Sequence, residues 1–463
     1  MFFLLDKVAL RNNYICLGQI LKEGGSPQTQ NFFLSIPDEK KKKEEGKMKK
    51  MWVSLTVAAV ILFTLGVILA EAADVIRLGS IYPLTGAIAS SGLRSKHAIE
   101  TALDVINNKY DLDVPFARTE GIPNLKGAKL EIIWGDSQAS PEVGKTEAER
   151  LITREKVPLI IGAYQSGVSK SASFVAERYK IPFVCAESSS AELTERGLKY
   201  FFRLAPTDAE DSIAFFNFLD EMKAKGKKVE RVALLYENTE FGVHAAGEAR
   251  KQAEKRGYKI VTDIPYPFKS TDVKSEVLKI KAAKPDVILQ ASLLGDMMLF
   301  AKTFKELKVD FNANLSYCGG YHDPSFVVNL KKDAEYFMGQ CTFSPDFITK
   351  KPVLGKLNEM YKKRSGVDFD GVTIEGFTSV LVVADALNRA KSTDPEALIQ
   401  ALRTTDLKTP TLPGDAVKFD EKGQNIKIIS NISQVQRGQY RVIWPAEMAA
   451  TGMVWPFMPW EKR

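Results

Sequence analysis

From residue 75 onward the chain alternates short runs of β-branched residues with longer amphipathic runs, and this alternation restricts its fold more than any other feature. The first series covers residues 75–186, where apolar runs such as VPLIIGA at 157–163 are separated by stretches with helical periodicity. Such a series is typical of βαβ units around a parallel sheet. We therefore expect a doubly wound α/β lobe in this part of the chain.

A second series of the same kind follows a short bridge, FFRLAPTD at residues 201–208. It contains RVALLYEN at 231–238, a nearly continuous apolar run of the kind found in strands that are buried on both faces. The segment AEYFMGQCTF at 334–343 is interpreted as a strand that returns to the first lobe, where a helix over 374–387 would pack. A chain of 463 residues can form two such cores, so two Rossmann-like lobes are predicted.

The formal net charge of +7 is concentrated near the N-terminus. Residues 40–50 (KKKKEEGKMKK) carry +5, whereas residues 74–463 carry +4 over 390 residues. This net charge per residue is too low to indicate a basic surface that binds nucleic acid, so no nucleic acid is expected as a partner. With three His in all, no metal-ligand spacing and no phosphate loop or nucleotide-binding glycine motif, the sequence predicts neither a metal nor a cofactor.

An uncharged apolar stretch, WVSLTVAAVILFTLGVILA at residues 52–70, follows the basic run and leads into AEAA at 70–73. A basic start, an apolar centre and an A-x-A signature are typical of a secretory signal peptide, which we assign to residues 48–73. The stretch is also long enough to span a bilayer, so an uncleaved anchor stays open. Either way, residues 74–463 are expected on the periplasmic or extracellular face. Residues 1–47 form a leader before the signal segment, and we interpret them as the result of a start codon placed too far upstream.

Three of the four cysteines lie beyond the signal segment, at Cys185, Cys318 and Cys341. An odd number in a compartment that permits disulfides allows at most one pair, and we favour buried free thiols. Cys318 and His322 are four residues apart and could be read as a nucleophile and its base. No third residue completes that constellation, so it does not indicate an enzyme.

Small hydroxyl residues fall at two strand-to-helix turns of the first series. In the first turn a buried strand leads into Gln165, Ser166 and a helix start. In the second turn the next strand leads into Ser188, Ser189, Ser190 and another helix start. Helix N-termini at the carboxyl ends of parallel strands bind anions through free backbone N–H groups. The two turns together predict a carboxylate site, whereas plain helix capping by serine explains each turn taken alone.

Several ordered motifs, at matching separations from residue 74 to about 445, resemble those of the branched-chain amino acid binding family of periplasmic ABC transporter proteins. The motifs are YPLTG at 82–86, IGAYQS at 161–166, ESSSAELTERG at 187–197, YENTEFG at 236–242 and FDEKG at 419–423. The resemblance implies a type I periplasmic binding fold, in which two lobes joined by hinge strands close on a ligand like a Venus flytrap. The limits it implies are 74–205 plus 342–419 for lobe one and 206–341 plus 420–463 for lobe two.

The resemblance also implies how lobe one holds a ligand. In this family two hydroxyl groups and backbone amides grip the ligand carboxylate, and these hydroxyls fall on Ser166 and Ser189. Tyr164 and Gln165 belong to the same motif and are expected beside them. The backbone carbonyl that receives the ligand ammonium falls on Glu187.

The positions implied for lobe two match the family in part. Asp208, after the first crossing between the lobes, and Phe241, an aromatic residue of lobe two, match in type. A second aromatic position aligns near Leu293, and the acidic residue that holds the ammonium aligns with Gly319, so both of these depart from the family.

The glycine at position 319 leaves two predictions open about the ligand. Either Asp296 or Asp323 supplies the missing carboxylate from a shifted position, or the ligand has no α-ammonium group. We favour an amino-acid-like ligand over other carboxylates such as aromatic or short aliphatic acids. The leucine at position 293 favours an apolar ligand body in either case.

These features predict a solute-binding protein, and not an enzyme, that captures a small carboxylate ligand and delivers it to the membrane permease of an ABC importer. A monomer is expected. A ligand-sensing receptor of the same fold is the alternative within the binding class, although a sensor usually continues into a transmembrane segment and a signalling domain. An exported hydrolase is the alternative from another class, and it requires a His or acidic partner within hydrogen-bond reach of Ser166.

Overall fold

The computed structural model describes residues 43, 46–47, 49–56 and 74–462. The chain divides into two units, Met1–Ala72 and Ala73–Arg463, and each is described by itself. In the first unit, residues 49–56 are helical and their side chains are exposed where described. The rest of the predicted signal segment, including most of its apolar centre and its A-x-A signature, lies outside the described residues.

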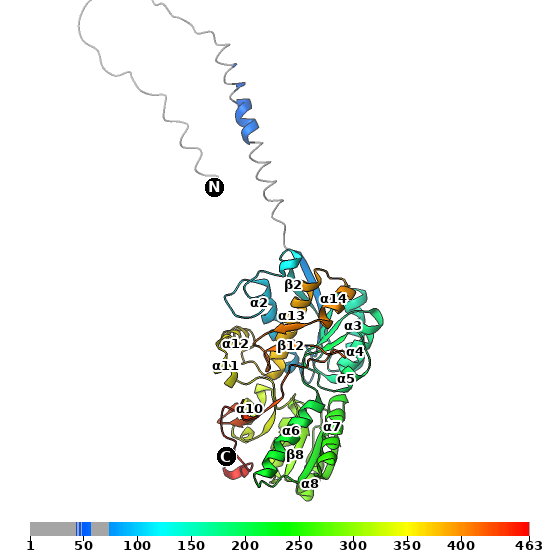
Figure 1. Cartoon of the computed structure of the whole chain (residues 1–463), viewed down its shortest axis with the longest axis vertical. Helices are drawn as coiled ribbons and strands as arrows, with labels where there is room; N and C mark the ends of the chain where they lie inside the picture. The colour runs from blue at the N-terminus through cyan, green and yellow to red at the C-terminus, as the bar shows by residue number, and fades with distance from the viewer. Residues whose placement is uncertain (1–42, 44–45, 48, 57–73, 463) are drawn as a thin grey trace, which may run out of the picture. The chain divides into compact units, whose positions relative to one another are not determined.

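A five-stranded parallel sheet with the order β2-β1-β3-β4-β5 forms the first lobe (Figure 1). One of its faces packs against α3 and α4, and the other packs against α2 and α13. Its elements are β1 Val75–Tyr82, α2 Ala89–Asn107, η1 Pro123–Leu125, β2 Lys129–Asp136, α3 Pro141–Thr153, β3 Ile160–Gly162, α4 Ser166–Tyr179, β4 Phe183–Cys185, α5 Glu192–Glu195 and β5 Phe201–Arg203. The order changes direction between β1 and β3, and such a switch point opens a crevice at the carboxyl ends of the strands.

The second lobe repeats this strand order. Its sheet runs β14-β13-β10-β9-β8-β6-β7, and the five parallel strands β6 to β10 follow the same winding as β1 to β5. Its elements are α6 Asp208–Ala224, β6 Arg231–Glu237, α7 Glu240–Arg256, β7 Lys259–Tyr266, α8 Lys274–Ala283, β8 Val287–Ala291, α9 Leu294–Glu306, β9 Ala313–Ser316, α10 Pro324–Leu330, η2 Lys331–Ala334, β10 Met338–Cys341, β13 Asn431–Gln436, β14 Gln439–Trp444 and η3 Trp460–Lys462. The strands β13 and β14 extend the edge at β10 in the antiparallel sense.

The remaining helices return to the first lobe. They are α11 Asp346–Lys350, α12 Pro352–Ser365, α13 Gly371–Ala390 and α14 Pro395–Arg403, and a small antiparallel pair follows, β11 Asp406–Lys408 with β12 Ala416–Lys418. Among the described residues, α13 is the helix long and apolar enough to cross a membrane, but 89% of its apolar window is buried inside the protein. Its composition is therefore that of a core helix.

The chain passes between the lobes three times, over residues 204–207, 342–345 and 424–430. The first and third crossings are joined by hydrogen bonds: the Gln424 side-chain amide donates to the Ala205 carbonyl at 2.9 Å, and the Asn425 side-chain amide donates to the Leu204 carbonyl at 3.2 Å. The segment 334–343 was expected to return to the first lobe as a strand, but β10 pairs within the second sheet and the crossing follows it. The lobe limits implied by the resemblance stay a prediction.

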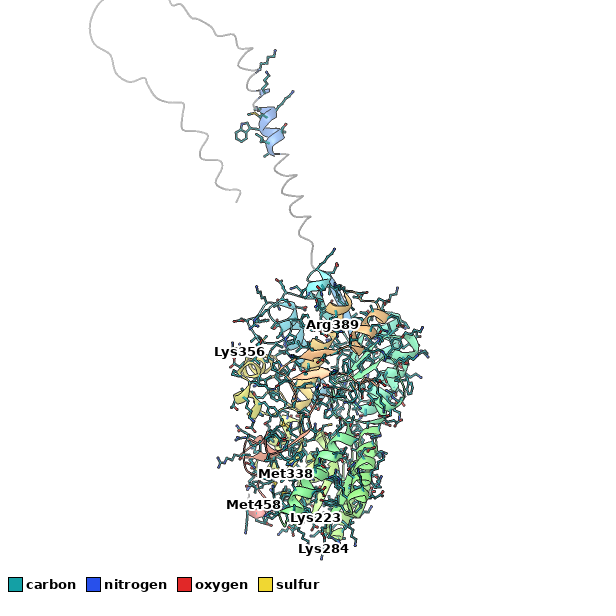
Figure 2. The ribbon with its side chains drawn as sticks, viewed as in Figure 1. Lys223, Lys284, Met338, Lys356, Arg389 and Met458 are labelled. Carbon is teal, nitrogen blue, oxygen red and sulfur yellow. The ribbon has the colours of Figure 1, made fainter. Side chains whose placement is uncertain are left out.

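Helix positions follow from local sequence, and burial follows from packing. The hydroxyl of Ser140 accepts from the Val143 N–H and caps α3, as the Ser-Pro pair predicts. Ile213 was expected on the buried face of α6, but its side chain is 42% exposed while Phe216 and Leu219 are buried. In Figure 2, Met338 lies in the core of the second lobe, whereas Lys223 and Lys284 project to solvent.

Candidate functional site

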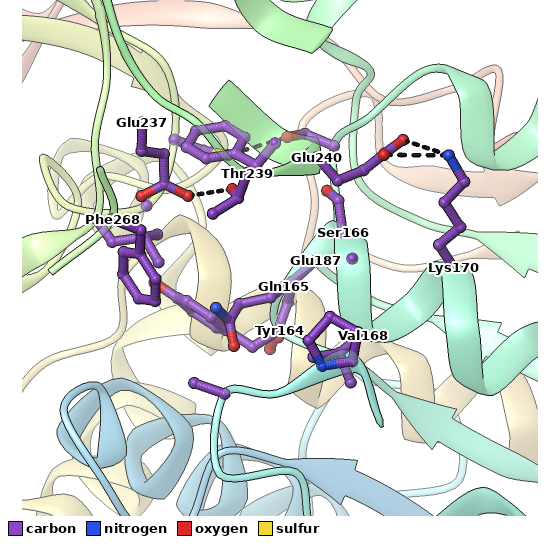
Figure 3. A pocket seen from close by; sticks show the side chains of 18 of the residues that line it. Tyr164, Gln165, Ser166, Val168, Lys170, Glu187, Glu237, Thr239, Glu240 and Phe268 are labelled. Atoms are coloured by element: carbon purple, nitrogen blue, oxygen red, sulfur yellow. Dashed lines mark hydrogen bonds and ion pairs between the residues drawn. The ribbon is translucent and has the colours of Figure 1, made fainter. Parts of the chain in front are cut away.

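A cavity of about 470 Å³ lies between the lobes, where the strands of both sheets end. This volume is within the range of small-molecule sites in proteins. Eight of the nine site residues expected from the sequence line it, and they are Tyr164, Gln165, Ser166, Glu187, Ser189, Phe241, Leu293 and Gly319. Figure 3 shows Tyr164 and Gln165 of the first lobe opposite Glu237 and Phe268 of the second.

The first turn of α4 presents donors to this cavity. The helix begins at Ser166 after the N-cap residue Gln165, whose side chain makes no capping hydrogen bond. Ser169 N–H is the first amide of the helix to find a partner inside it, the Gln165 carbonyl at 2.9 Å. The amides of Ser166, Gly167 and Val168 therefore lie before the intrahelical ladder, and all three residues line the cavity. Free amides at a helix N-terminus can bind an anion.

The second serine turn differs from the prediction. The helix that follows it, α5, has four residues and ends before Gly197, whose φ of +69° is left-handed. A single turn adds little dipole, so the turn contributes hydroxyl groups rather than a second helix N-terminus. The Ser189 hydroxyl accepts a long contact of 3.6 Å from the Cys318 thiol, and the Ser188 hydroxyl donates to the Ala163 carbonyl at 2.8 Å.

Asp208 is the one predicted site residue that does not line the cavity. It is the first residue of α6, it is fully buried, and its N–H donates to the Ser189 carbonyl at 2.8 Å. Thr207 and Glu210 form a capping box around the helix start, which satisfies two backbone N–H groups there. Burial raises the pKa of Asp208 to about 7. The residue lies behind the serine turn rather than in the cavity.

Gly319 and Leu293, the two positions predicted to differ from the family, lie side by side. The φ of Gly319 is +92°, and a Cβ placed there would lie 3.0 Å from Leu293 Cδ2. A larger side chain at 319 would be strained by its backbone and would meet the leucine. Leu293 therefore occupies the space that an acidic side chain would need.

The two acids proposed as substitutes are engaged elsewhere. Asp323 is fully buried, caps α10 through the Ser325 N–H at 2.9 Å, and accepts from Arg94 at 2.6 Å. Asp296 accepts from the Lys269 N–H at 3.2 Å and does not line the cavity. Neither carboxylate reaches the cavity in this structure.

Other cavity residues were missed by sequence reasoning. Glu237 ends β6 and uses one oxygen to accept from the Thr239 hydroxyl at 2.5 Å, while burial raises its pKa to about 7. Phe268 follows β7, and Val372 lies in the first turn of α13. The position of Glu237 at the end of a buried apolar strand was a usable signal, whereas nothing local marks Phe268 or Val372.

The side chain of Glu187 adds a feature that the sequence did not predict. Its carbonyl was the expected contact, but the carboxyl group also lies at the cavity, 4% exposed and with no hydrogen-bond partner for either oxygen. Burial raises its pKa to about 8, although nearby Ser95 and Tyr82 hydroxyls lower it in part. A neutral carboxyl group is therefore present beside the carboxylate site at neutral pH.

The hydrolase alternative lacks its machinery in the described part of the chain. The Ser166 hydroxyl accepts from the Ser190 N–H at 3.3 Å and has no His or acidic partner. Burial raises the pKa of the Cys318 thiol well above its usual value and lowers that of His322 to about 3, so the pair is neither an anion nor a useful base. Cys185, Cys318 and Cys341 are free thiols.

Comparison with known proteins agrees with this geometry. The family model described as periplasmic binding protein matches residues 75–438. A curated relative from Brucella suis, named Leu/Ile/Val-binding protein homolog 7, is 28% identical over 417 residues, which cover 86% of this chain and 97% of the relative.

Two solved structures share the fold. The branched-chain amino acid transporter substrate binding protein LivJ from Streptococcus pneumoniae, in complex with isoleucine, has a TM-score of 0.68 at 19% identity and covers 80% of this chain and 100% of its own. A solute binding protein from Rhodopseudomonas palustris, in complex with 3,4-dihydroxy benzoic acid, has a TM-score of 0.67 at 22% identity, with 79% and 95% covered. With its two repeated lobes and a cavity between them, the chain belongs to the periplasmic binding protein family, whose members bind solutes and are not enzymes.

Proposed function

We propose that this protein is the solute-binding component of an ABC importer and that it captures a small carboxylate with an apolar body, an amino acid above all. The observation that carries the proposal is the set of donors on the cavity wall: the first-turn amides of α4 and the hydroxyls of Ser166 and Ser189. A carboxylate placed there meets hydrogen-bond donors without any free Lys or Arg.

The remainder of the cavity suits an apolar ligand body. Tyr164 and Val168 of the first lobe and Phe241, Phe268 and Leu293 of the second line it. Closing the lobes over such a body removes apolar surface from water, and this burial stabilises the closed form that a permease recognises. The curated relative named as a Leu/Ile/Val-binding protein and the neighbour solved with isoleucine support an aliphatic amino acid.

An aromatic carboxylate is the second candidate. Two observations favour it: aromatic rings line both walls, and solved neighbours of the same fold contain 3,4-dihydroxy benzoic acid and 4-hydroxybenzoate. The glycine at 319 leaves no acidic side chain at the position where the family holds an ammonium, and a benzoate needs none.

Native mass spectrometry of the exported protein would identify the ligand that co-purifies, and calorimetry with Ser166→Ala would test the site. A hydrogen bond to a charged group contributes about 1.5–3 kcal/mol, so the variant should bind about tenfold more weakly or worse with unchanged thermal stability. Thr146→Ala, which removes an exposed hydroxyl of α3 outside the cavity lining, is the matched control. Equal affinity in Ser166→Ala and wild type would refute the carboxylate site.

Export by the segment at residues 48–73 is part of the same proposal. N-terminal sequencing of the secreted protein should begin at or near Ala73. Mature protein found in the cytoplasm with residues 1–47 attached would contradict it.

A further inference from the structure

A small enclosed chamber adjoins the main cavity on the side of the interlobe crossings. Glu187, Ser189, Cys318 and Val372 line both spaces, so the two are neighbours. The chamber is also lined by the first crossing, at residues 205–206, and by Thr342 of the second. Its free volume of about 10 Å³ is room for a single water-sized group.

The chamber is lined by carboxyl groups from both lobes. Glu187 and Glu375 come from the first lobe and Asp211 comes from α6 of the second, and none is more than 4% exposed. Glu375 accepts from the Thr342 hydroxyl at 2.8 Å and Asp211 accepts from the Ser430 hydroxyl at 2.6 Å. Both oxygens of Glu187 and the second oxygen of Asp211 make no hydrogen bond in this structure, although the Ser95 and Tyr82 hydroxyls lie near Glu187.

No cation from the described residues lines this chamber. The nearby guanidinium of Arg94 is held by Asp323 and Asp370, and that of Arg203 by the Ser190 carbonyl and the Gln424 side chain. His322 lines the chamber but is neutral, because burial lowers its pKa to about 3. Buried carboxyl oxygens without partners cost free energy, and a bound cation would supply donors to them and favour their ionised form.

We infer that the chamber receives the ammonium group of the ligand, with the carboxyl groups of Glu187, Asp211 and Glu375 as its acceptors. This inference rests on the proposed carboxylate site at Ser166 and Ser189. An ammonium group is about as large as a water molecule and brings three donors, which matches both the volume and the unpartnered oxygens. A methyl group of the same size would bury those oxygens without a partner.

The position of Ser189 narrows the ligand class. This residue lines the main cavity, where it is proposed to bind the carboxylate, and it also lines the chamber. The carboxylate and the ammonium must then lie within one residue's width of each other, as they do in an α-amino acid. The acids of the chamber thus replace the acidic side chain that Gly319 lacks, from the opposite side of the ligand.

The test is a calorimetric screen of the wild-type protein against the twenty amino acids and their matched desamino acids, for example leucine with 4-methylpentanoate and phenylalanine with 3-phenylpropanoate. At least one amino acid should bind tenfold or more tightly than its desamino partner. A desamino acid that binds as tightly as its amino acid overturns the inference and leaves the carboxylate site intact. If no amino acid binds, the inference is also overturned, and the benzoates in the same screen decide the proposed function separately.

Variants locate the ammonium. Glu375→Gln and Asp211→Asn should each weaken the best amino acid about tenfold while changing the desamino acid less than threefold. Asp296→Asn, which removes a buried acid outside both cavities, is the control and should change neither. Loss of amino-acid binding in Glu237→Gln with no effect in the two chamber variants would place the ammonium at Glu237 and overturn the inference. Thermal melts of each variant check folding.

Discussion

Among the polar contacts that join the lobes, two ion pairs differ clearly in burial. At one, Arg94 of α2 bonds across to Asp323 at the start of α10 and also pairs with Asp370 of its own lobe, with the arginine side chain 10% exposed. At the other, Lys170 of α4 pairs with Glu240 of α7 at 3.1 Å, and its side chain is 31% exposed (Figure 3). We call them the Arg94 contact and the Lys170 contact.

The Arg94 contact should resist separation because it is buried, whereas the Lys170 contact can break and re-form because it is partly exposed. Burial strips water from the Arg94 contact, so removing one partner leaves uncompensated charge in the interior. Burial alone would lower the pKa of Arg94, but Asp370 and Asp323 together raise it well above its ordinary value. The Lys170 contact keeps water within reach, so its ions can separate at little cost. The lobes are therefore expected to open more easily at the Lys170 side.

The largest expected effect is on the Arg94 contact. Arg94→Met leaves Asp323 and Asp370 buried without their cation, so the free energy of unfolding should fall by about 3–5 kcal/mol. Urea denaturation monitored by circular dichroism measures it. Lys170→Met is the matched control and should change the same quantity by less than about 1 kcal/mol. Equal losses in the free energy of unfolding from the two substitutions would show that the contacts do not differ in their contribution to stability.

A smaller effect on the free energy of unfolding is expected from pH, because burial raises the pKa of an acid in the folded state. The folded pKa of Glu187, about 8, exceeds its unfolded value of 4.5, so the native state keeps a proton that the unfolded chain loses between these values. Stability should therefore fall as pH rises through this window, by up to about 2 kcal/mol from pH 6 to 7.5 for this one group. Tyr82, Arg94, Asp370 and Glu375 are the titratable and charged groups that face Glu187.

The comparison of wild type with Glu187→Gln isolates that group. Burial also raises the pKa values of Asp211 and Glu375 well above their usual range, and these acids act in the same direction in both proteins. The difference in urea-derived stability between the two proteins should widen from pH 6 to 7.5 in favour of the variant. A constant difference would mean that Glu187 is ionised in the folded protein at pH 6.

The smallest expected effect concerns salt at the Lys170 contact. Raising NaCl from 0.05 to 0.5 M screens a partly exposed pair, so ligand affinity should fall by less than about fivefold in wild type and should not change in Lys170→Met. Calorimetric titration at the two salt concentrations measures this. A salt effect that persists unchanged in Lys170→Met would assign it to another group.

The repeated β-branched and amphipathic pattern was enough to predict two parallel-sheet lobes, because strands that are mostly buried, such as β6 and β8, have largely apolar sequences. The same local reasoning located Ser166 at a helix start. It misjudged α5, since ELTE reads as a helix start while the left-handed Gly197 ends the helix after one turn. Asp208, predicted as a site residue, does not line the cavity in this structure and lies at the start of α6 behind the serine turn.

The chamber could not be predicted in the same way. Glu187 and Glu375 are separated by 188 positions, and neither has a neighbour in sequence that suggests a buried carboxyl group. Their proximity depends on the packing of α13 against the strand ends of the first sheet. Leu293 and Gly319 are likewise brought together only by the fold. The sequence comparison identifies two positions that differ from the family, but it does not show that the Leu293 side chain occupies the space beside Gly319.

The three crossings between the lobes have a mechanical consequence. A body joined to another by one connection can turn about any axis through it, whereas three connections restrict its rotation and favour a hinge movement. Cutting the backbone in one crossing, for example at residues 342–345, would leave two covalent connections in place. The cut divides the chain into two fragments, and each fragment still crosses between the lobes once. The lobes would therefore stay joined while the fragments remain folded together, with more freedom to twist, and the fragments would separate under denaturing conditions.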